Sequence, residues 1–379
     1  LEYLSLSKEE YCFLESSITS LDKSYLDYLM KLRLKPREQV TCSFKPVDDS
    51  DSDAALGSLE LMVEGLWVET ILYEIPLLAL ISEAYFMFVD TDWNYDGQEE
   101  KAYEKAMQLL RSGCVFSEFG TRRRRDYNTQ SLVLQGLVKA QKECKKLNLS
   151  GKLTGTSNVH FAMRYGIPPI GTVAHEWFMG VAAISGDYKI ANFKALHYWV
   201  ECFGISDLGS ILTDTFGTPA FLEAFRQPVP GLSEKKLFLE CFSGVRQDSG
   251  DPILFVKRMK EFYDNEGIRD QKTIVFSDSL DVHSCLKYKE VAEKAGFNCI
   301  FGIGTSLTND FFHTSNGQKS TPLNIVIKLS SVEGNPAIKL SDNAGKNMGD
   351  QATVDKVKMI LGYTEIDWQL GNESHRWST

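Results

Sequence analysis

The sequence predicts an α/β protein in which an irregular β/α barrel is joined to a second, α+β sandwich-like domain. From residue 115 onward, short apolar runs that end in small polar or acidic residues alternate with stretches of helical periodicity. Buried parallel strands are typically short continuous apolar runs, and strands that alternate with helices indicate βα units. The length of 379 residues suits two domains or one large α/β unit. Because so many units end in polar residues, a barrel whose loops meet at one mouth is favoured over an open sheet.

The first 114 residues predict the α+β domain. One helix is expected to begin at Ser7, and three more are expected over residues 25–32, 68–88 and 98–111. Residues 40–44 and 59–65 are predicted to be strands, and residues 48–55 a polar loop. The apolar stretch at residues 75–89 contains Pro76 and Glu83, which favours a buried helix over a membrane span. The chain does not begin with Met, so we expect an N-terminal piece to be absent from it.

The predicted barrel covers residues 115–330, and the tail at residues 331–379 is expected to return to mixed structure and join the first domain. The apolar runs that predict its strands, together with the polar residues that end them, lie at residues 114–116, 153–158, 170–176, 211–215, 244–252, 274–279, 299–305 and 325–329. In a barrel, the loops that follow the carboxyl ends of these strands converge on the active-site mouth.

Four consecutive arginines, residues 122–125, lie between the first of these strands and a predicted helix that starts near Asn128. A helix N-terminus favours an anion through its free N–H groups and its dipole, and arginine matches phosphate oxygens bidentately. Basic runs are more often a solvated face or a nuclear-import patch. We favour an anion site because the run lies between apolar segments in an acidic chain of formal net charge −10.

Composition limits the alternatives. An acidic balance argues against general nucleic-acid binding, which needs a broad basic surface, although binding through the four arginines is a further reading to keep. The eight cysteines are scattered without a Cys-x-x-Cys pair. We therefore expect a reduced cytoplasmic or nuclear setting and no structural zinc.

Polar residues at the predicted strand ends are the candidates for chemistry. Arg246, Asp248 and Asp251 share a turn-forming segment, which suits an arginine held by carboxylates, a metal-linked phosphate site, or a purely structural turn. Asp214 and Asp278 suit ribose hydroxyls or a hydrated Mg²⁺, yet aspartate is also a common helix N-cap.

His175 follows a strand-like apolar run, where a histidine is either a phosphate acceptor, a base or, more often, a structural residue. The glycine-rich turn at residues 301–305 suits a phosphate or simply a tight βα connection. Spacing alone yields no Ser-His-Asp or metal triad. The residues by themselves predict a barrel with a phosphate-binding mouth.

Several motifs in order carry a resemblance to a known family. They are residues 116–125 (FSEFGTRRRR), 155–158 (GTSN), 171–177 (GTVAHEW), 212–217 (LTDTFG), 245–252 (VRQDSGDP), 276–279 (FSDS), 301–305 (FGIGT) and 343–346 (NAGK). Together they resemble the nicotinate phosphoribosyltransferases of fungal type, from about residue 60 to the C-terminus. The resemblance implies an ATP-dependent, ligase-type enzyme of NAD salvage. It would join nicotinate to phosphoribosyl pyrophosphate, giving nicotinate mononucleotide and pyrophosphate, through a phosphohistidine.

The resemblance also implies roles for single residues. His175 matches the histidine that ATP phosphorylates, and Phe119 matches the aromatic residue that stacks on the pyridine ring. Arg122 and Arg246 match arginines that bind phosphate and substrate. Cations of this kind suit a reaction in which pyrophosphate leaves from an oxocarbenium-like ribose.

Further roles concern the ribose and its 5′-phosphate. Asp248 and Asp278 match catalytic acidic groups near the ribose or Mg²⁺, and Asp214 is expected among the substrate-binding residues. The loop for the 5′-phosphate is matched by Gly302, Gly304 and Thr305. Mg²⁺ is expected to arrive with ATP and phosphoribosyl pyrophosphate, without direct protein ligation.

One position bears on the choice between nicotinate and nicotinamide. The related nicotinamide enzyme has Gly-Thr-Asp where this chain has Gly-Thr-Val at residues 171–173. Val173 removes a carboxylate that would repel nicotinate, and a hydroxyl such as that of Ser157 suits its carboxylate. A repulsive or lost buried polar contact costs roughly 1–3 kcal/mol, enough for useful discrimination.

Two other functions compete with this one: nicotinamide phosphoribosyltransferase, and a non-catalytic sensor of nucleotide precursors. The family's N-terminal Asp-x-Tyr-Lys segment, whose tyrosine in relatives completes a neighbouring subunit's ring-stacking site, does not occur in this sequence. Relatives lead us to expect a homodimer, with small-molecule partners only and neither nucleic acid nor membrane.

Overall fold

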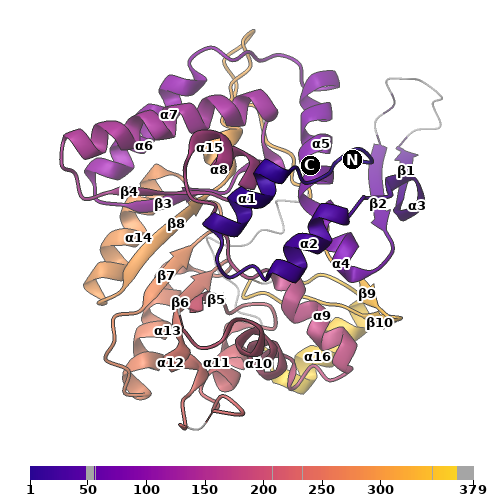
Figure 1. Cartoon of the computed structure of the whole chain (residues 1–379), viewed down its shortest axis with the longest axis vertical. Helices are drawn as coiled ribbons and strands as arrows, with labels where there is room; N and C mark the ends of the chain where they lie inside the picture. Colours follow the sequence, from indigo (N-terminus) through magenta and orange to yellow (C-terminus); the bar gives the residue numbers. More distant parts are fainter. Residues whose placement is uncertain (48–54, 56, 207, 233, 344, 365–379) are drawn as a thin grey trace.

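Figure 1 presents a computed structural model that describes residues 1–47, 55, 57–206, 208–232, 234–343 and 345–364. The predicted polar loop at residues 48–55 lies outside this part, apart from Ala55. The N-terminal region contains α1 (Lys8–Ser17), α2 (Lys23–Lys31), α3 (Pro36–Gln39), the antiparallel pair β1 (Val40–Pro46) and β2 (Gly57–Val63), α4 (Trp67–Thr70), η1 (Ile71–Tyr73), α5 (Glu74–Phe88) and α6 (Gln98–Arg111). The predicted start at Ser7 is confirmed, because Ser7 and Glu10 cap each other's backbone N–H groups.

Six parallel strands form the central sheet, in the order β4-β3-β8-β7-β6-β5. They are β3 (Val115–Glu118), β4 (Lys152–Thr156), β5 (Leu208–Leu212), β6 (Phe242–Gln247), β7 (Thr273–Phe276) and β8 (Asn298–Ile303). The α/β class is confirmed. The barrel is irregular because, among the described residues, the end strands β4 and β5 do not pair with each other.

Helices connect these strands and cover the sheet (Figure 1). They are α7 (Tyr127–Lys146), α8 (Val159–Tyr165), α9 (His175–Ser185), α10 (Ala191–Phe203), α11 (Thr218–Phe225), α12 (Phe238–Cys241), α13 (Pro252–Asn265), α14 (Val282–Lys294) and α15 (Thr305–Thr308). The strands β9 (Ser331–Val332) and β10 (Asn335–Pro336) and helix α16 (Gln351–Leu361) complete the described chain. Under the helices the core is rich in phenylalanine; for example, the Phe276 and Phe301 rings stack with centroids 5.5 Å apart.

Two predicted strands are wrong. Residues 170–174 form no strand but lead directly into α9, so His175 is the first residue of a helix and does not end a strand. Residues 325–329 also form no strand, and the carbonyl of Ile325 accepts a hydrogen bond from Arg123 Nε at 3.0 Å. An apolar run becomes a strand only where a partner strand satisfies its backbone, which is a long-range property.

Helix α5 is buried on one face only, although the sequence predicted a buried helix. Leu78, Ala79 and Phe86 are buried, whereas Leu80 and Phe88 are exposed. The continuous helical stretch Trp67–Phe88 is long and apolar enough to span a membrane by length and composition alone, and 33% of its most apolar window is buried in the protein. The apolar face of α5 that carries Leu80 and Phe88 therefore lies on the surface of the molecule.

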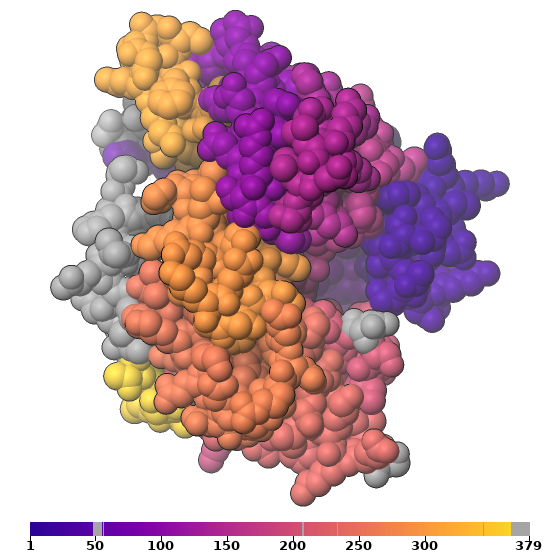
Figure 2. Space-filling model, turned by 90° about the vertical axis from the view of Figure 1, so that its left-hand side faces the viewer, coloured from indigo at the N-terminus to yellow at the C-terminus, as the bar shows by residue number. Residues whose placement is uncertain are grey.

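The C-terminal tail packs against the β/α part of the molecule. Ala337 is buried with Met179 of α9, and the Leu340 N–H donates to the carbonyl of Thr215 at 2.7 Å. In Figure 2, turned by 90°, the first helices protrude from one side of the body. The division into residues 1–114 with 331–379, and residues 115–330, stays a prediction.

Candidate active site

A cavity of about 660 Å³ lies at the carboxyl ends of β3, β6, β7 and β8. Parallel strands end together there, so residues far apart in the chain meet. Nine of the predicted site residues line it: Phe119, Arg122, His175, Arg246, Asp248, Asp278, Gly302, Gly304 and Thr305. The predicted mouth of the β/α unit is therefore a real hollow in the described structure.

The four arginines of residues 122–125 point to different places. Arg122 and Arg123 line the cavity, and Arg122 Nη1 donates to Glu74 Oε1 at 3.1 Å. Arg124 turns away and donates to Gln130 Oε1 at 3.1 Å. The run is thus not one solvated basic face, and only its first half serves the cavity.

Arg125 is part of the protein interior. Its side chain is fully buried, with the guanidinium carbon 3.6 Å from the ring centroid of Phe86 and 4.2 Å from that of Phe311. Its Nη2 donates to Ser320 Oγ at 2.8 Å, and Nη1 lies 3.8 Å from Asp90 Oδ2. Burial lowers the pKa of Arg125 to about 10, so the side chain remains charged at neutral pH.

The packing of the Phe119 ring requires a glycine on the neighbouring strand β8. Its N–H donates to the Ile303 carbonyl at 2.8 Å, which ties the end of β3 to the end of β8. A Cβ atom on Gly302 would lie 2.6 Å from the Phe119 ring. Gly302 is therefore needed for close packing beneath this aromatic wall of the cavity.

Arg246 and Asp248 form the centre of a hydrogen-bonded network. Arg246 donates to Ser277 Oγ at 2.8 Å, to Thr172 Oγ1 at 2.6 Å and to Asp248 Oδ1 at 2.9 Å. The second oxygen of Asp248 lies 2.9 Å from His175 Nε2. Although burial opposes ionisation, the charge of Arg246 holds the pKa of Asp248 well below its usual range.

His175 lies at the start of α9 with little exposed surface. Its Nδ1 is 3.0 Å from Thr215 Oγ1, and its Nε2 is 2.9 Å from Lys339 Nζ. Burial, and then the charge of Lys339, lower the pKa of His175 from 6.5 to about 4 against the opposing effects of Asp214 and Asp248. At neutral pH the imidazole is uncharged and keeps one nitrogen lone pair, as a nucleophile requires.

Comparison with protein families identifies the chain. The model of the nicotinate phosphoribosyltransferase (NAPRTase) family matches residues 114–365, and the model of the NAPRTase N-terminal domain matches residues 1–82. The chain belongs to the nicotinate phosphoribosyltransferase family. This confirms the resemblance drawn from the ordered motifs.

Relatives and solved structures agree with this assignment. The nicotinate phosphoribosyltransferase of Saccharomyces cerevisiae is 48% identical over 94% of this chain and 82% of its own length. That of Methanosarcina mazei is 39% identical, over 96% of this chain and 86% of its own. A crystal structure assigned to the S. cerevisiae enzyme has a TM-score of 0.89 at 47% identity, covering 96% of this chain and 86% of the other. A nicotinate phosphoribosyltransferase structure from Porphyromonas gingivalis has a TM-score of 0.81 at 32% identity, covering 95% and 86%.

Helix α9 of this phosphoribosyltransferase is tied to the N-terminal region. Trp67 Nε1 donates to Glu176 Oε1 at 2.7 Å, and the Trp67 and Trp177 rings stack with centroids 6.2 Å apart. Trp199 packs edge-on against Trp177 at 5.8 Å. The residues that immediately follow His175 are therefore held by an aromatic cluster.

Three lysines near the cavity were not singled out as site residues from the sequence. Lys328, Lys339 and Lys346 all line it, and Lys346 Nζ donates to Asp278 Oδ2 at 3.0 Å. Lys339 lies between Ile338 and Leu340, which are both fully buried. A single lysine inside the short apolar run of residues 337–340 is the one local hint that it could be buried.

Three predicted site residues do not line the cavity. Asp214 is buried behind His175, with its Oδ2 3.7 Å from Lys339 Nζ. Ser157 is exposed just after β4, where its N–H donates to the Glu118 carbonyl at 2.8 Å, and Val173 belongs to the hydrophobic core. The described cavity is therefore lined by residues other than these three. Val173→Asp would bury a charge in the core, so the variant would change folding as well as specificity.

The sequence left open whether the aspartates at the strand ends are helix N-caps, and the structure answers this differently for different residues. The N-cap of α14 is Asp281 and that of α11 is Gly217, so neither Asp278 nor Asp214 is a cap. Asp251 does cap α13, because its side chain accepts from the Ile253 N–H at 2.7 Å. The structural reading of the turn thus holds for Asp251, while Asp248 belongs to the cavity.

No group of three or more His, Cys, Asp or Glu side chains within the described ranges is placed to hold a metal ion. The carboxylates on the cavity wall are Glu74, Asp248 and Asp278. Each already pairs with a cation, namely Arg122, Arg246 and Lys346 in that order. These partners suit a site where Mg²⁺ is held mainly by substrate phosphates.

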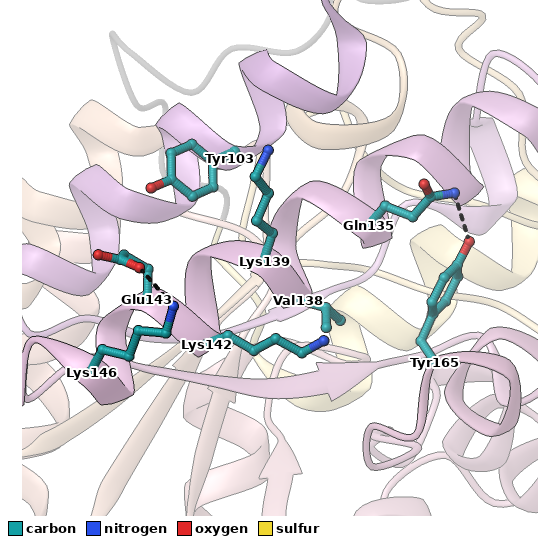
Figure 3. A pocket seen from close by; sticks show the side chains of 8 residues that line it. All are labelled: Tyr103, Gln135, Val138, Lys139, Lys142, Glu143, Lys146 and Tyr165. Carbon is teal, nitrogen blue, oxygen red and sulfur yellow. Dashed lines mark hydrogen bonds and ion pairs between the residues drawn. The ribbon is translucent and has the colours of Figure 1, made fainter.

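A second hollow of about 420 Å³ lies over α6, α7 and α8, and Figure 3 shows its side chains. It is lined by Tyr103, Gln135, Val138, Lys139, Lys142, Glu143, Lys146 and Tyr165. None of the predicted site residues is among them. The catalytic candidates of this family member gather only around the larger cavity.

Acid should destabilise the enzyme partly through His175. Because its pKa falls from 6.5 to about 4 on folding, the unfolded chain binds a proton first as the pH drops. The stabilising contribution is complete above pH 6.5 and is lost as the pH falls towards 4. Between pH 7 and pH 5 we expect the parent to lose roughly 2 kcal/mol more unfolding free energy than His175→Gln. Denaturant unfolding at both pH values measures this, and equal losses in the two proteins would contradict it.

Proposed function

We propose that the protein joins nicotinate to phosphoribosyl pyrophosphate, giving nicotinate mononucleotide and pyrophosphate in NAD salvage. The observation that carries the proposal is the network of Arg246, Asp248 and His175 on the wall of one cavity with arginines and lysines around it. Cations suit the 5′-phosphate and the pyrophosphate of the donor, and carboxylates suit the ribose. The names of relatives with 48% and 39% identity support nicotinate as the acceptor.

The chemistry follows from charge. The ring nitrogen of nicotinate forms a bond to the anomeric carbon, and the bond from that carbon to pyrophosphate breaks with its electron pair on the leaving oxygen. Arg122 and Arg246 would stabilise that leaving group, while Asp248 and Asp278 would face the positive charge that develops on the ribose. Phe119 would stack on the pyridine ring, and the turn with Gly302 would receive the 5′-phosphate.

The proposal includes coupling to ATP through phosphorylation of His175. Support comes from its uncharged imidazole, which lies between Thr215 and Lys339 and borders the cavity. Mg²⁺ is expected to enter with the phosphates of ATP and phosphoribosyl pyrophosphate, where it would neutralise their charge.

The decisive assay supplies Mg²⁺, phosphoribosyl pyrophosphate and either nicotinate or nicotinamide, with and without ATP. Formation of mononucleotide and of ADP is followed for the parent and for His175→Ala. We expect product from nicotinate, stimulated by ATP in the parent only. Product mainly from nicotinamide would reject nicotinate as the substrate, and absence of product with either base would favour the precursor sensor.

A homodimer is also proposed. It is supported by the exposed apolar side chains of α5 and of the β1–β2 hairpin, which include Leu80, Met87, Phe88, Leu59 and Met62. A contiguous exposed apolar surface commonly marks a protein–protein contact. Sedimentation of the parent should give a dimer, and Met87→Glu combined with Phe88→Glu should shift it towards monomer. A parent that sediments as a monomer at micromolar concentration would contradict the dimer.

A further inference from the structure

Lys339 is held in a fixed place beside His175. Its side chain is 9% exposed, and its backbone exchanges two hydrogen bonds with Met348, at 3.0 and 2.8 Å. Its Nζ lies 2.9 Å from His175 Nε2 and 3.7 Å from Asp214 Oδ2. A buried ammonium group directed at a histidine nitrogen requires an explanation beyond packing.

The contact restricts where the proton of His175 can be. An ammonium group only donates hydrogen bonds, so Lys339 attracts Nε2 only when that nitrogen carries its lone pair. The single imidazole proton then lies on Nδ1 and is donated to Thr215 Oγ1 at 3.0 Å. Asp248 Oδ2, at 2.9 Å from Nε2, favours the opposite tautomer. Lys339 and Asp248 therefore favour opposite tautomers of His175. Without Lys339, Asp248 would favour the tautomer that carries its proton on Nε2.

We propose that Lys339 is a positioning residue that keeps Nε2 of His175 unprotonated and then binds the phosphoryl group transferred to it. The inference rests on the proposed ATP coupling. In the transfer, the Nε2 lone pair forms the bond to the γ-phosphorus of ATP, and the bond from that phosphorus to the bridging oxygen breaks. ADP leaves with the electron pair, and the Nδ1 proton stays on the ring against Thr215. The ammonium of Lys339, already beside Nε2, then pairs with the new phosphoryl oxygens.

The test compares Lys339→Met, which keeps length without charge, with Lys339→Arg, which keeps the charge. Lys272→Met is the matched control, since Lys272 is also buried but donates to the Phe242 carbonyl at 2.8 Å, at the opposite end of the sheet. We expect Lys339→Met to reduce acid-labile phosphate incorporation from ATP by roughly tenfold or more. Its mononucleotide formation without ATP should change less, Lys339→Arg should recover part of the loss, and Lys272→Met should keep the parent's degree of ATP stimulation.

A second readout does not depend on turnover. In ¹⁵N-histidine-labelled protein, with the His175 signals assigned by their loss in His175→Gln, the parent should show an unprotonated Nε2. Lys339→Met should show a protonated Nε2. An unchanged tautomer together with unchanged phosphate incorporation would overturn the inference. A parent that makes mononucleotide without any effect of ATP would reject the coupling and with it the phosphoryl role, while the ¹⁵N signals would still decide the tautomer.

Discussion

Replacing Arg246 with alanine should lower kcat/KM for mononucleotide formation by about 10²–10³-fold. Arg246 is held by Ser277, Thr172 and Asp248, so its charge is positioned before the substrate arrives. Removing one such preorganised donor from a developing negative charge commonly has an effect of this size. Steady-state kinetics of the parent and variant would measure it, with circular dichroism to confirm that both are folded.

Two further variants sharpen this experiment. Arg246→Lys keeps a positive charge but lacks the planar fork that reaches three partners, so most of the loss should remain. Arg269 is an exposed arginine on a loop, and Arg269→Ala should stay within about twofold of the parent. Near-parent activity in Arg246→Ala would remove this residue from the proposed site.

Replacing Arg125 with alanine should reduce the free energy of unfolding by about 3–5 kcal/mol. The change removes a fully buried cation from between Phe86 and Phe311 and leaves Asp90 without its arginine partner. It also leaves a cavity, because the surrounding rings can relax only in part. Denaturant-induced unfolding of the parent and variant at the same pH would measure the difference.

Arg122 supplies the matched comparison within the same run. Its side chain is 36% exposed, so Arg122→Ala should change the unfolding free energy by less than about 1 kcal/mol while weakening turnover. The two alanine variants should therefore have opposite profiles, one folded but impaired and one destabilised. Equal stability of both variants would show that Arg125 is not the interior support described here.

Much of the architecture follows from local sequence patterns. The helix predicted over residues 98–111 is confirmed, and so are six of the eight strands predicted from residue 114 onward, because periodicity and capping are local properties. The ends of parallel strands also predicted where Arg246, Asp248 and Asp278 would meet. Strand ends converge by geometry, whatever the loops between them do.

Other features depend on pairing across the chain and were missed. Nothing local shows that Arg125 would be buried while Arg122, three residues earlier, lines a cavity. The strand predicted over residues 325–329 does not form, and there the Ile325 carbonyl accepts a hydrogen bond from the Arg123 side chain and not from a neighbouring strand. Lys339 comes into contact with His175 only because the tail folds back beside α9.

The aromatic cluster next to His175 gives the enzyme an intrinsic optical reporter. Trp177, two residues after His175, is packed between Trp67 and Trp199, and Glu176 holds the Trp67 indole N–H. A charge that appears on His175 changes the electric field at these rings, and a movement of α9 changes their stacking. Ligand binding and phosphorylation should therefore alter tryptophan emission without any added label, so that each step can be timed by stopped-flow fluorescence.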